Sequence, residues 1–326
     1  MTITRLKIWA KPVNCINRVK GLTSGATIPI SSDTTIKVNV ELLSIGNELL
    51  SGTIANKNAQ WISGKITQAG GLVKRITTVG DSISEISAAA KESIQRNPDW
   101  LIVSGGLGPT YDDKTLQGLS TALGQELALD PEALEMLRKS YARNPSTRNY
   151  ELNDIRLKMA KIPRGSVPIQ NPVGSAPSVI IKNTNSNNPN SKTRIVCLPG
   201  VPKEMKAVFS NTIMPQLKIT IGDYFFAESV FETIGISESM LAPTLSSIVD
   251  SYPVDAIYLK THPRVETSNK HKVKPKLNIQ IVSKGKEKVQ VKKRYNDILD
   301  ALTSEIGRLG GKIYLANAKR MKSDNL

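Results

Sequence analysis

The segment DWLIVSGGLGPTYDDKTLQGLSTALG, from Asp99 to Gly124, joins a short apolar run to a helix-like stretch through a glycine-rich turn. The run from Trp100 to Val103 is typical of a buried strand. Three glycines follow its carboxyl end, and two adjacent aspartates stand before the helix. Backbone freedom and negative charge together suit a turn that wraps an anionic ligand and a cation. A tight turn followed by an acidic helix start is the alternative.

Two similar units precede this segment and give the chain a strand-helix rhythm. We expect strands within 36–46, 72–81 and 99–106, alternating with helices within 58–71, 83–97 and 113–124. Short connections between such units predict a mostly parallel sheet with helices on both faces, and ligands bind beyond the carboxyl ends of its strands. The turns SIGNELLSG, TVGDS and SGGLGPTYDD should meet at that edge, and each carries glycine and an acid.

Four regions follow from the pattern along the rest of the chain. We expect residues 1–35 to form a basic, disordered extension, 36–218 a nucleotide- or pterin-binding α/β domain, 219–314 a small α+β domain and 315–326 a basic tail. Asp130 is expected to cap a helix that begins at Pro131. The polar stretch from Asn183 to Thr193 is expected to be a hairpin loop.

Composition places the chain among globular proteins. It has 326 residues, of which 39% are hydrophobic and 22% charged, and no apolar run approaches the roughly 20 residues that span a bilayer. The amino-terminal stretch lacks the apolar core of a secretory signal. The two cysteines, Cys15 and Cys197, form no CxxC motif. We therefore expect a cytoplasmic protein without a membrane partner.

The formal net charge of +16 is carried by the two ends of the chain. Residues 1–38 hold six basic side chains and one acid, 39–259 hold 21 of each sign, and 260–326 hold 17 basic side chains and six acids. Basic ends can attract nucleic acid. Aromatic residues make up only 5%, and no basic stretch is interleaved with aromatics, which argues against nucleic acid as the main ligand.

The glycine turn is the first candidate for ligand binding. Gly105, Gly106 and Gly108 allow the backbone to approach a phosphate and direct amides toward it. The turn lacks the Gly-Lys-Ser/Thr of a P-loop and the GxGxxG of a dinucleotide site. Glycines of a plain strand-helix turn are the structural alternative.

Carboxylates close to this turn suggest a metal. Asp112 and Asp113 would repel a phosphate unless a cation joined them, and Asp81 on the neighbouring turn could share that cation. Mg²⁺ or a similar divalent ion takes such oxygen ligands, withdraws charge from a phosphoryl oxygen and activates water. Glu48 is either a further carboxylate of the site or an acid of a helix start, and Lys114 is interpreted as an exposed helix lysine.

Several other residues are expected to line the pocket. Asn58 either hydrogen-bonds a ligand or caps its helix, and His262 either binds a phosphate with Lys260 and Arg264 or lies in a surface loop. The proposed nucleotide-binding set is Ser44, Gly46, Asn58, Gly105, Gly106, Gly108, Thr110, Asn171, Gly174, Pro199 and Gly200.

Five motifs in this order resemble a known family. SIGNELLSGTIANKNAQWIS, TTVGDS, SGGLGPTYDDKT, NPVGSAPS and LPGVPKEMK are similar to the CinA amino-terminal domain, a branch of the MoaB/MogA molybdopterin-binding fold. The resemblance implies a three-layer α/β/α fold and a homo-oligomer, with a dimer favoured. It places catalytic acids at Asp81 and Asp113, and implies metal-dependent hydrolysis of ADP-ribose to AMP and ribose 5-phosphate.

The sequence departs from this resemblance at specific positions. Asn47 stands where relatives often carry Asp or Thr, and Leu107 replaces the Thr of the pterin-binding GGTG, which argues against a pterin. The chain is also too short to contain a CinA-type nicotinamide mononucleotide deamidase domain, so we expect no deamidase activity.

Three hypotheses about function remain. The first is an ADP-ribose pyrophosphohydrolase in which Asp81, Asp112, Asp113 and Glu48 organise metal and water, while a basic residue from an unidentified loop neutralises the phosphate. The second is a molybdopterin-binding protein that transfers AMP or inserts metal. The third is a binding protein that uses its basic carboxyl-terminal surface.

Overall fold

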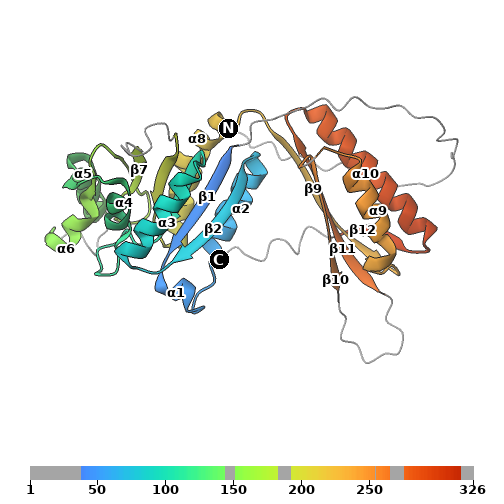
Figure 1. Cartoon of the computed structure of the whole chain (residues 1–326), viewed down its shortest axis with the longest axis horizontal. Coiled ribbons are helices and arrows are strands. Elements are labelled where there is room, and N and C mark those ends of the chain that lie inside the picture. The colour runs from blue at the N-terminus through green and yellow to red at the C-terminus, as the bar shows by residue number, and fades with distance from the viewer. Residues whose placement is uncertain (1–37, 144–150, 183–191, 254, 265–274, 317–326) are drawn as a thin grey trace. The chain divides into compact units, whose positions relative to one another are not determined.

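The chain is described by a computed structural model that covers residues 38–143, 151–182, 192–253, 255–264 and 275–316. The predicted extension at 1–35, the loop residues 183–191 and the tail residues 317–326 therefore lie outside the described residues. Two main sheets organise the described residues, one within 39–198 and one within 225–315 (Figure 1). No helix in the described part of the chain is long and apolar enough to cross a membrane.

The first sheet contains six strands, and a helix follows each of its four parallel strands. Its strands are β1 (Asn39–Ile45), β2 (Leu72–Val79), β3 (Trp100–Ser104), β6 (Val167–Ile169), β7 (Ser178–Lys182) and β8 (Arg194–Leu198). The helices around it are α1 (Asn47–Leu50), α2 (Lys57–Ala69), α3 (Ile83–Gln95), α4 (Thr115–Leu123), α7 (Pro202–Val208), the π-helical turn η2 (Phe209–Ile213) and α8 (Met214–Ile221). Beside it lie β4 (Leu127–Leu129), α5 (Pro131–Arg143), α6 (Asp154–Leu157), η1 (Lys158–Ala160) and β5 (Lys161–Pro163).

The strand order confirms a mainly parallel sheet. The order is β2-β1-β3-β8-β7-β6, and the neighbours from β2 to β8 are parallel. Strands β7 and β6 add to one edge in antiparallel orientation. The central strands β1, β3 and β8 are buried along nearly their whole length, as their continuous apolar runs predict for a sheet covered on both faces.

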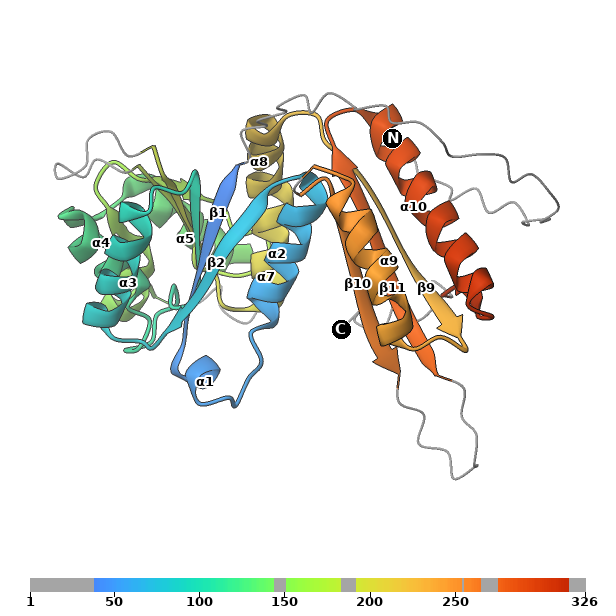
Figure 2. The ribbon, with the colours of Figure 1, turned by 45° about the vertical axis from the view of Figure 1, so that its right-hand side comes forward.

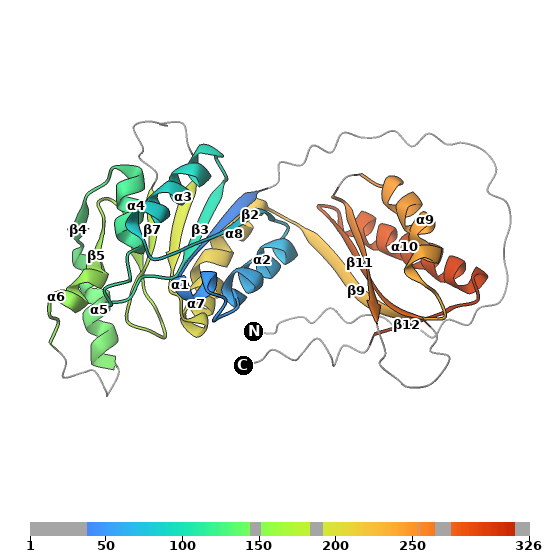
Figure 3. The same cartoon turned by 60° about the horizontal axis from the view of Figure 1, so that its bottom comes forward.

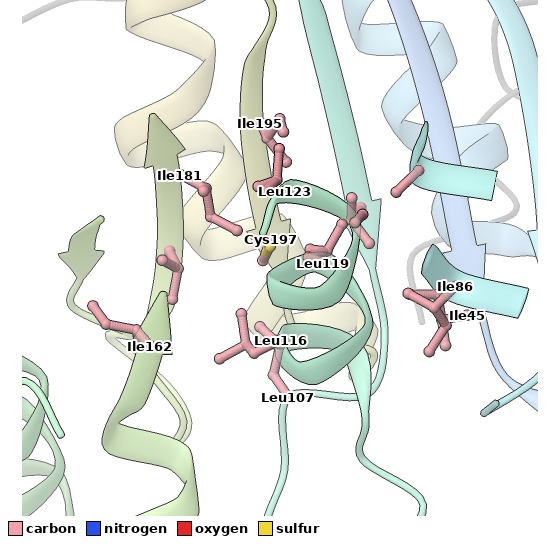
Figure 4. Close-up of a cluster of buried hydrophobic side chains, with 14 of the residues drawn as sticks. Ile45, Ile86, Leu107, Leu116, Leu119, Leu123, Ile162, Ile181, Ile195 and Cys197 are labelled. Carbon is pink, nitrogen blue, oxygen red and sulfur yellow. The ribbon is translucent and has the colours of Figure 1, made fainter. Parts of the chain in front are cut away.

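Helices cover both faces and give the predicted three layers. Figure 2 shows α3 and α4 on one side of the sheet and α2, α7 and α8 on the other. One core cluster joins Ile86 and Leu119 to the sheet residues Val103 and Cys197 (Figure 4), and a second gathers around Trp100 on the opposite face. Burial raises the pKa of the Cys197 thiol well above its usual range, so this side chain behaves as an inert core residue.

Local signals explain where several helices begin. Asp130 Oδ1 accepts from the amide of Ala133 at 2.8 Å, which confirms the predicted cap of α5. In α2 the cap is Asn56, whose Oδ1 accepts from Ala59 N at 3.1 Å, so the alternative that Asn58 caps this helix is wrong. Helix α4 begins at Thr115, after the two aspartates, and an acidic helix start at the pair is therefore also wrong.

The second sheet alternates strands and helices in a βαββαβ order. Its elements are β9 (Phe225–Ile234), α9 (Glu238–Asp250), β10 (Ile257–Arg264), β11 (Lys276–Gly285), α10 (Lys288–Arg308) and β12 (Lys312–Leu315). The strand order is β10-β11-β9-β12, and all neighbours are antiparallel. Figure 3 shows α9 and α10 on the same face of this sheet. Leu277, Ile279 and Ile281 of β11 form the core beneath these helices.

A buried ion pair joins β1 to the end of α3. Glu41 is 5% exposed, and Arg96 donates from Nε and Nη2 to its two carboxylate oxygens at 2.8 and 2.7 Å. Burial alone would raise the pKa of Glu41, but the hydrogen bonds and charge of Arg96 hold this pKa below its usual range. Bidentate geometry makes this pair strong, because the buried carboxylate keeps both oxygens bonded.

We expect Arg96→Ala to lower the free energy of unfolding by about 2 to 3 kcal/mol, because it leaves the Glu41 carboxylate buried without its partner. The contribution should be complete above the unfolded pKa of about 4.3 and disappear as the pH falls through the lowered folded pKa. Urea unfolding at several pH values measures both effects. Arg164→Ala is the control, because Arg164 pairs with Glu126 at a similar 2.9 Å while both side chains are 70% exposed. An equal loss in both variants would contradict the prediction.

Candidate functional site

The turns after four neighbouring strands begin at one edge of the first sheet. The register places Ile45 beside Val79, Ser44 beside Ser104, and Ser104 beside Leu198. Because β2, β1, β3 and β8 are parallel, their carboxyl ends share this edge. The three turns that the sequence expects to meet therefore lie on adjacent strands, and the turn after β8 joins them.

Gly105 and Gly106 are required by the close packing of the turn after β3. Their φ angles are +107° and +63°, which favour glycine. A Cβ on Gly105 would overlap the backbone carbonyl of Ile45, and a Cβ on Gly106 would overlap the side-chain oxygen of Thr115. Thr115 Oγ1 also donates to the carbonyl oxygen of Gly105 at 2.8 Å. The turn is thus held against both β1 and the start of α4.

The backbone of this turn carries unpaired donors. The N–H groups of Gly106, Leu107 and Gly108 have no hydrogen-bond partner among the residues that the structure describes. The Leu107 side chain is buried in the core beside Leu116 (Figure 4), and this packing holds the turn against the core. Successive unpaired amides are suited to bind an anion, so they support the phosphate site, which stays a prediction.

The two aspartates after the glycines have different surroundings. Asp113 Oδ2 accepts from the backbone N–H of Thr110 at 2.8 Å and from the Thr110 hydroxyl, so it closes the loop on itself. Asp112 is half-buried, and its Oδ1 has no partner within the described residues.

A lysine that the sequence did not single out lies against this loop. Lys158, at the start of η1, donates from Nζ to the carbonyl oxygen of Thr110 at 2.6 Å. Burial lowers the pKa of its ammonium, and the charges of Asp113 and Asp112 oppose that shift. Lys158 and Lys161 line a cavity of about 40 Å³ together with Asp113 and the glycine turn. This lysine is a candidate for the phosphate-neutralising residue that the sequence left unidentified.

Asp81 connects two neighbouring turns. Its Oδ2 accepts from the backbone N–H of Asn47 at 2.9 Å, and Asn47 Oδ1 accepts from the N–H of Asp81 at 3.4 Å. Glu48 is exposed in the first turn of α1, and its carboxylate lies where a Cβ of Gly46 would be. Asp81 therefore stabilises the start of α1 in this structure.

The described carboxylates do not assemble into a resident metal site. No three His, Cys, Asp or Glu side chains within the described ranges lie close enough together to share an ion. Asp113 is bonded to Thr110 and Asp81 to Asn47, so the predicted trio with Asp112 does not converge on one point. The carboxylates of Asp81, Asp112 and Asp113 therefore form no shared cluster among the described residues, and a divalent cation at this edge stays a prediction.

A second group of polar atoms lies at the ends of β1 and β8. Asn58 Nδ2 donates to the carbonyl oxygen of Gly200 at 2.7 Å, which links the start of α2 to the turn after β8. Asn58 Oδ1 and Ser44 Oγ are buried and have no partner among the described residues. Buried polar atoms are normally bonded, so these two are available to a ligand at this edge.

The other predicted turn residues hold the structure together. Asn171 is fully buried and uses its whole side-chain amide internally: Nδ2 donates to Ala176 O at 3.1 Å and to Glu204 Oε2 at 2.7 Å, and Oδ1 accepts from the N–H groups of Val173 and Gly174 at 3.1 and 2.8 Å. Pro199 is also buried. These residues support the walls of the site and offer a ligand no free side-chain group.

His262 belongs to the second sheet. It is exposed near the carboxyl end of β10, so its assignment to the surface is confirmed and its assignment to a loop is wrong. Pro263, which follows it, favours a loop in sequence, but β10 is an edge strand and edge strands tolerate proline. His262 is placed on a strand with Lys260 and Arg264 rather than among the residues of the first sheet.

Comparison with known proteins gives matches over much of the chain. Residues 41–219 match the family described as "Probable molybdopterin binding domain". A protein of Sulfolobus acidocaldarius is 38% identical, with 84% of this chain and 96% of the relative covered, and one of Sulfurisphaera tokodaii is 40% identical, with 84% and 97% covered. The crystal structure of CinA, of unknown function, from Thermoplasma acidophilum is 37% identical, covers 55% of this chain and 98% of its own, and has a TM-score of 0.47.

Proposed function

Because this chain belongs to the family of probable molybdopterin binding domains, we propose that it binds a phosphorylated pterin of the molybdopterin type at the carboxyl edge of its first sheet. The observation that carries the proposal is the juxtaposition of three unpaired amides with a half-buried lysine. The N–H groups of Gly106, Leu107 and Gly108 lack partners among the described residues, and Lys158 lines the same cavity. Amides and an ammonium together favour a phosphate.

The volume of this cavity suggests that the phosphate and the pterin ring bind at different parts of the sheet edge. A cavity of about 40 Å³ holds about three water molecules, which is comparable with one phosphate group. The pterin ring must then lie outside this cavity, along the ends of β3, β1 and β8. Ser44 Oγ and Asn58 Oδ1 supply unpaired polar atoms there, and a pterin has N–H groups and ring nitrogens that can bond to them.

The same observations favour the pterin over metal-dependent hydrolysis of ADP-ribose. The hydrolase hypothesis needs carboxylates that share an ion, and the described carboxylates do not form such a group. The objection drawn from Leu107 also loses force, because that side chain is packed in the core while the turn offers its backbone amides. Transfer of AMP or insertion of metal, as in the second hypothesis, would both require this phosphate-binding step.

We expect Lys158→Met to weaken binding of a phosphorylated pterin by about 10- to 100-fold, because a charge-assisted hydrogen bond to phosphate is lost. Quenching of pterin fluorescence or calorimetry measures the dissociation constant, with the same pterin lacking its phosphate as the second ligand. Affinity for the dephosphorylated pterin should change little, since Lys158 is assigned to the phosphate alone.

Lys139→Met is the matched control for this experiment. Lys139 is 70% exposed on α5 and pairs only with Glu135 among the described residues, so the variant removes the same charge away from the site. Thermal unfolding should show that both variants fold. If Lys158→Met binds the phosphorylated pterin as tightly as the unaltered chain, or loses affinity equally for both pterins, the proposed phosphate position is refuted.

A further inference from the structure

The second sheet leaves one face without a helix of its own. Both α9 and α10 pack on the other face: Thr261 Oγ1 donates to Glu238 of α9, and Ser283 Oγ donates to the carbonyl oxygen of Val291 of α10 at 3.0 Å. Leu277, Ile279 and Ile281 point the same way. Because strand side chains alternate, every second residue of β9 to β12 belongs to the opposite face, which we call the open face.

The strand register aligns the open-face residues in rows across the sheet. One row pairs His262 with Asn278, Asn278 with Glu232, and Glu232 with Tyr314. The next row pairs Arg264 with Lys276, Lys276 with Ile234, and Ile234 with Lys312. Two further rows lie on the other side of the first row. One contains Lys260, Gln280 and Val230, and the next contains Tyr258, Val282 and Glu228.

Positive charge dominates the open face. Its basic residues are Lys260, Arg264, Lys276, Lys284 and Lys312, and its acids are Glu228 and Glu232. Both acids are engaged within the face, because Gln280 Nε2 donates to Glu228 and Arg264 pairs with Glu232 at 3.1 Å. Lys260 and Lys312 are exposed. A surface with this charge is complementary to a polyanion.

Each edge strand of the face carries one tyrosine beside a basic residue of the same strand, Tyr258 beside Lys260 and Tyr314 beside Lys312. Tyr258 on β10 is 48% exposed and Tyr314 on β12 is 49% exposed. The strand order separates these two edge strands by β11 and β9, which corresponds to about 14 Å at a strand spacing of about 4.8 Å. Between them, Asn278 Oδ1 is buried and has no partner among the described residues. The face thus offers stacking surfaces at its edges and an unpaired acceptor near its centre.

We infer that the open face binds single-stranded nucleic acid, with bases stacked on Tyr258 and Tyr314 and phosphates on the basic residues beside these rings on the same edge strands. A basic surface with exposed aromatic rings binds single-stranded nucleic acid with little sequence preference. A duplex keeps its bases stacked on one another, so they cannot stack on the tyrosine rings. An acidic protein would bind the basic residues without requiring the two rings. The inference is independent of the proposed pterin site.

The test compares two double substitutions in the full chain. Lys260→Gln with Lys312→Gln removes two charges from the open face, and Lys292→Gln with Lys293→Gln removes two exposed charges from α10, on the helix side of the same sheet. The probe is a fluorescein-labelled 12-nucleotide single-stranded RNA of mixed sequence, with a DNA probe of the same sequence as a second arm. Fluorescence anisotropy gives the dissociation constant at 50 and 200 mM salt.

We expect the open-face pair to weaken binding by about tenfold and to reduce the salt slope by about 1.4, whereas the α10 pair should change affinity less than about twofold. Tyr258→Leu and Tyr314→Leu should each weaken binding about fivefold or more without removing charge. Binding of either the RNA or the DNA probe in this pattern supports the inference. Thermal unfolding establishes that each variant is folded.

Three results would overturn the inference. Equal losses in the two lysine pairs would mean that only the net charge of the chain matters. Tyrosine variants that bind as the unaltered chain does would mean that no base stacks on the face. A duplex of the same length that binds as tightly as the single strand would exclude recognition of unstacked bases.

Discussion

Gly105→Ala is expected to lower the free energy of unfolding by about 4 kcal/mol. This is the largest loss of stability that we expect from adding one methyl group in the first sheet. Two terms add. The φ of +107° disfavours any residue with a Cβ, and the new methyl group would overlap the carbonyl of Ile45. That carbonyl belongs to the backbone of β1 and cannot rotate away as a side chain could, so β1 or the turn must move.

Gly124→Ala is the matched control for this prediction. Gly124 also has a positive φ, +64°, but a Cβ built there meets no atom within 4 Å. We expect it to lose only about 1 kcal/mol, the strain of the left-handed backbone alone. Chemical denaturation of both variants measures the difference, which isolates the contact with β1. Similar losses at the two positions would mean that the turn after β3 yields easily, and the rigid phosphate-binding turn proposed above would lose its basis.

Strands and their order of appearance could be predicted because their signals are local. The apolar run from Trp100 to Val103 is continuous, which is typical of a strand covered on both faces, and β3 is such a strand. The glycines themselves mark where the strand must end. The antiparallel pairing of β6 and β7 at the edge has no comparable signal, since β6 has three residues and its partner is chosen by tertiary packing.

The candidate site was only partly predictable because its bonds are made between segments. Adjacent aspartates suggest a metal in sequence, but Asp113 finds its partner in Thr110, three residues earlier, and is used by the loop. Lys158 lies 48 residues from Thr110, in a segment with no motif, and only folding brings it to the turn. Likewise, no stretch of sequence interleaves aromatic and basic residues, yet Tyr258 and Tyr314 reach one face from separate strands.

Asn171→Ala is expected to lower the free energy of unfolding by about 4 kcal/mol, because it leaves several buried polar groups without partners. The amide side chain makes four hydrogen bonds, one of them to the Glu204 carboxylate at 2.7 Å. Asn58→Ala is the contrasting variant. Among the described residues, the Asn58 side chain makes one hydrogen bond, to Gly200 O, and its Oδ1 is unpaired. The variant should reduce pterin affinity and leave stability within about 1 kcal/mol of the unaltered chain.

Asn171→Asp tests the same contacts with no change of shape. The substitution replaces the Nδ2 donors by an oxygen that faces Glu204 Oε2 and Ala176 O, so acceptor meets acceptor. Burial beside a second carboxylate raises the pKa of the introduced carboxyl in the folded state above its unfolded value of about 3.9. The loss of stability should therefore be full at pH 8 and shrink as the pH falls through that raised pKa, where the protonated carboxyl can donate again. Urea unfolding between about pH 4 and pH 8 measures this dependence. A constant difference from the unaltered chain across that range would mean that the Asn171 amide does not face the Glu204 carboxylate.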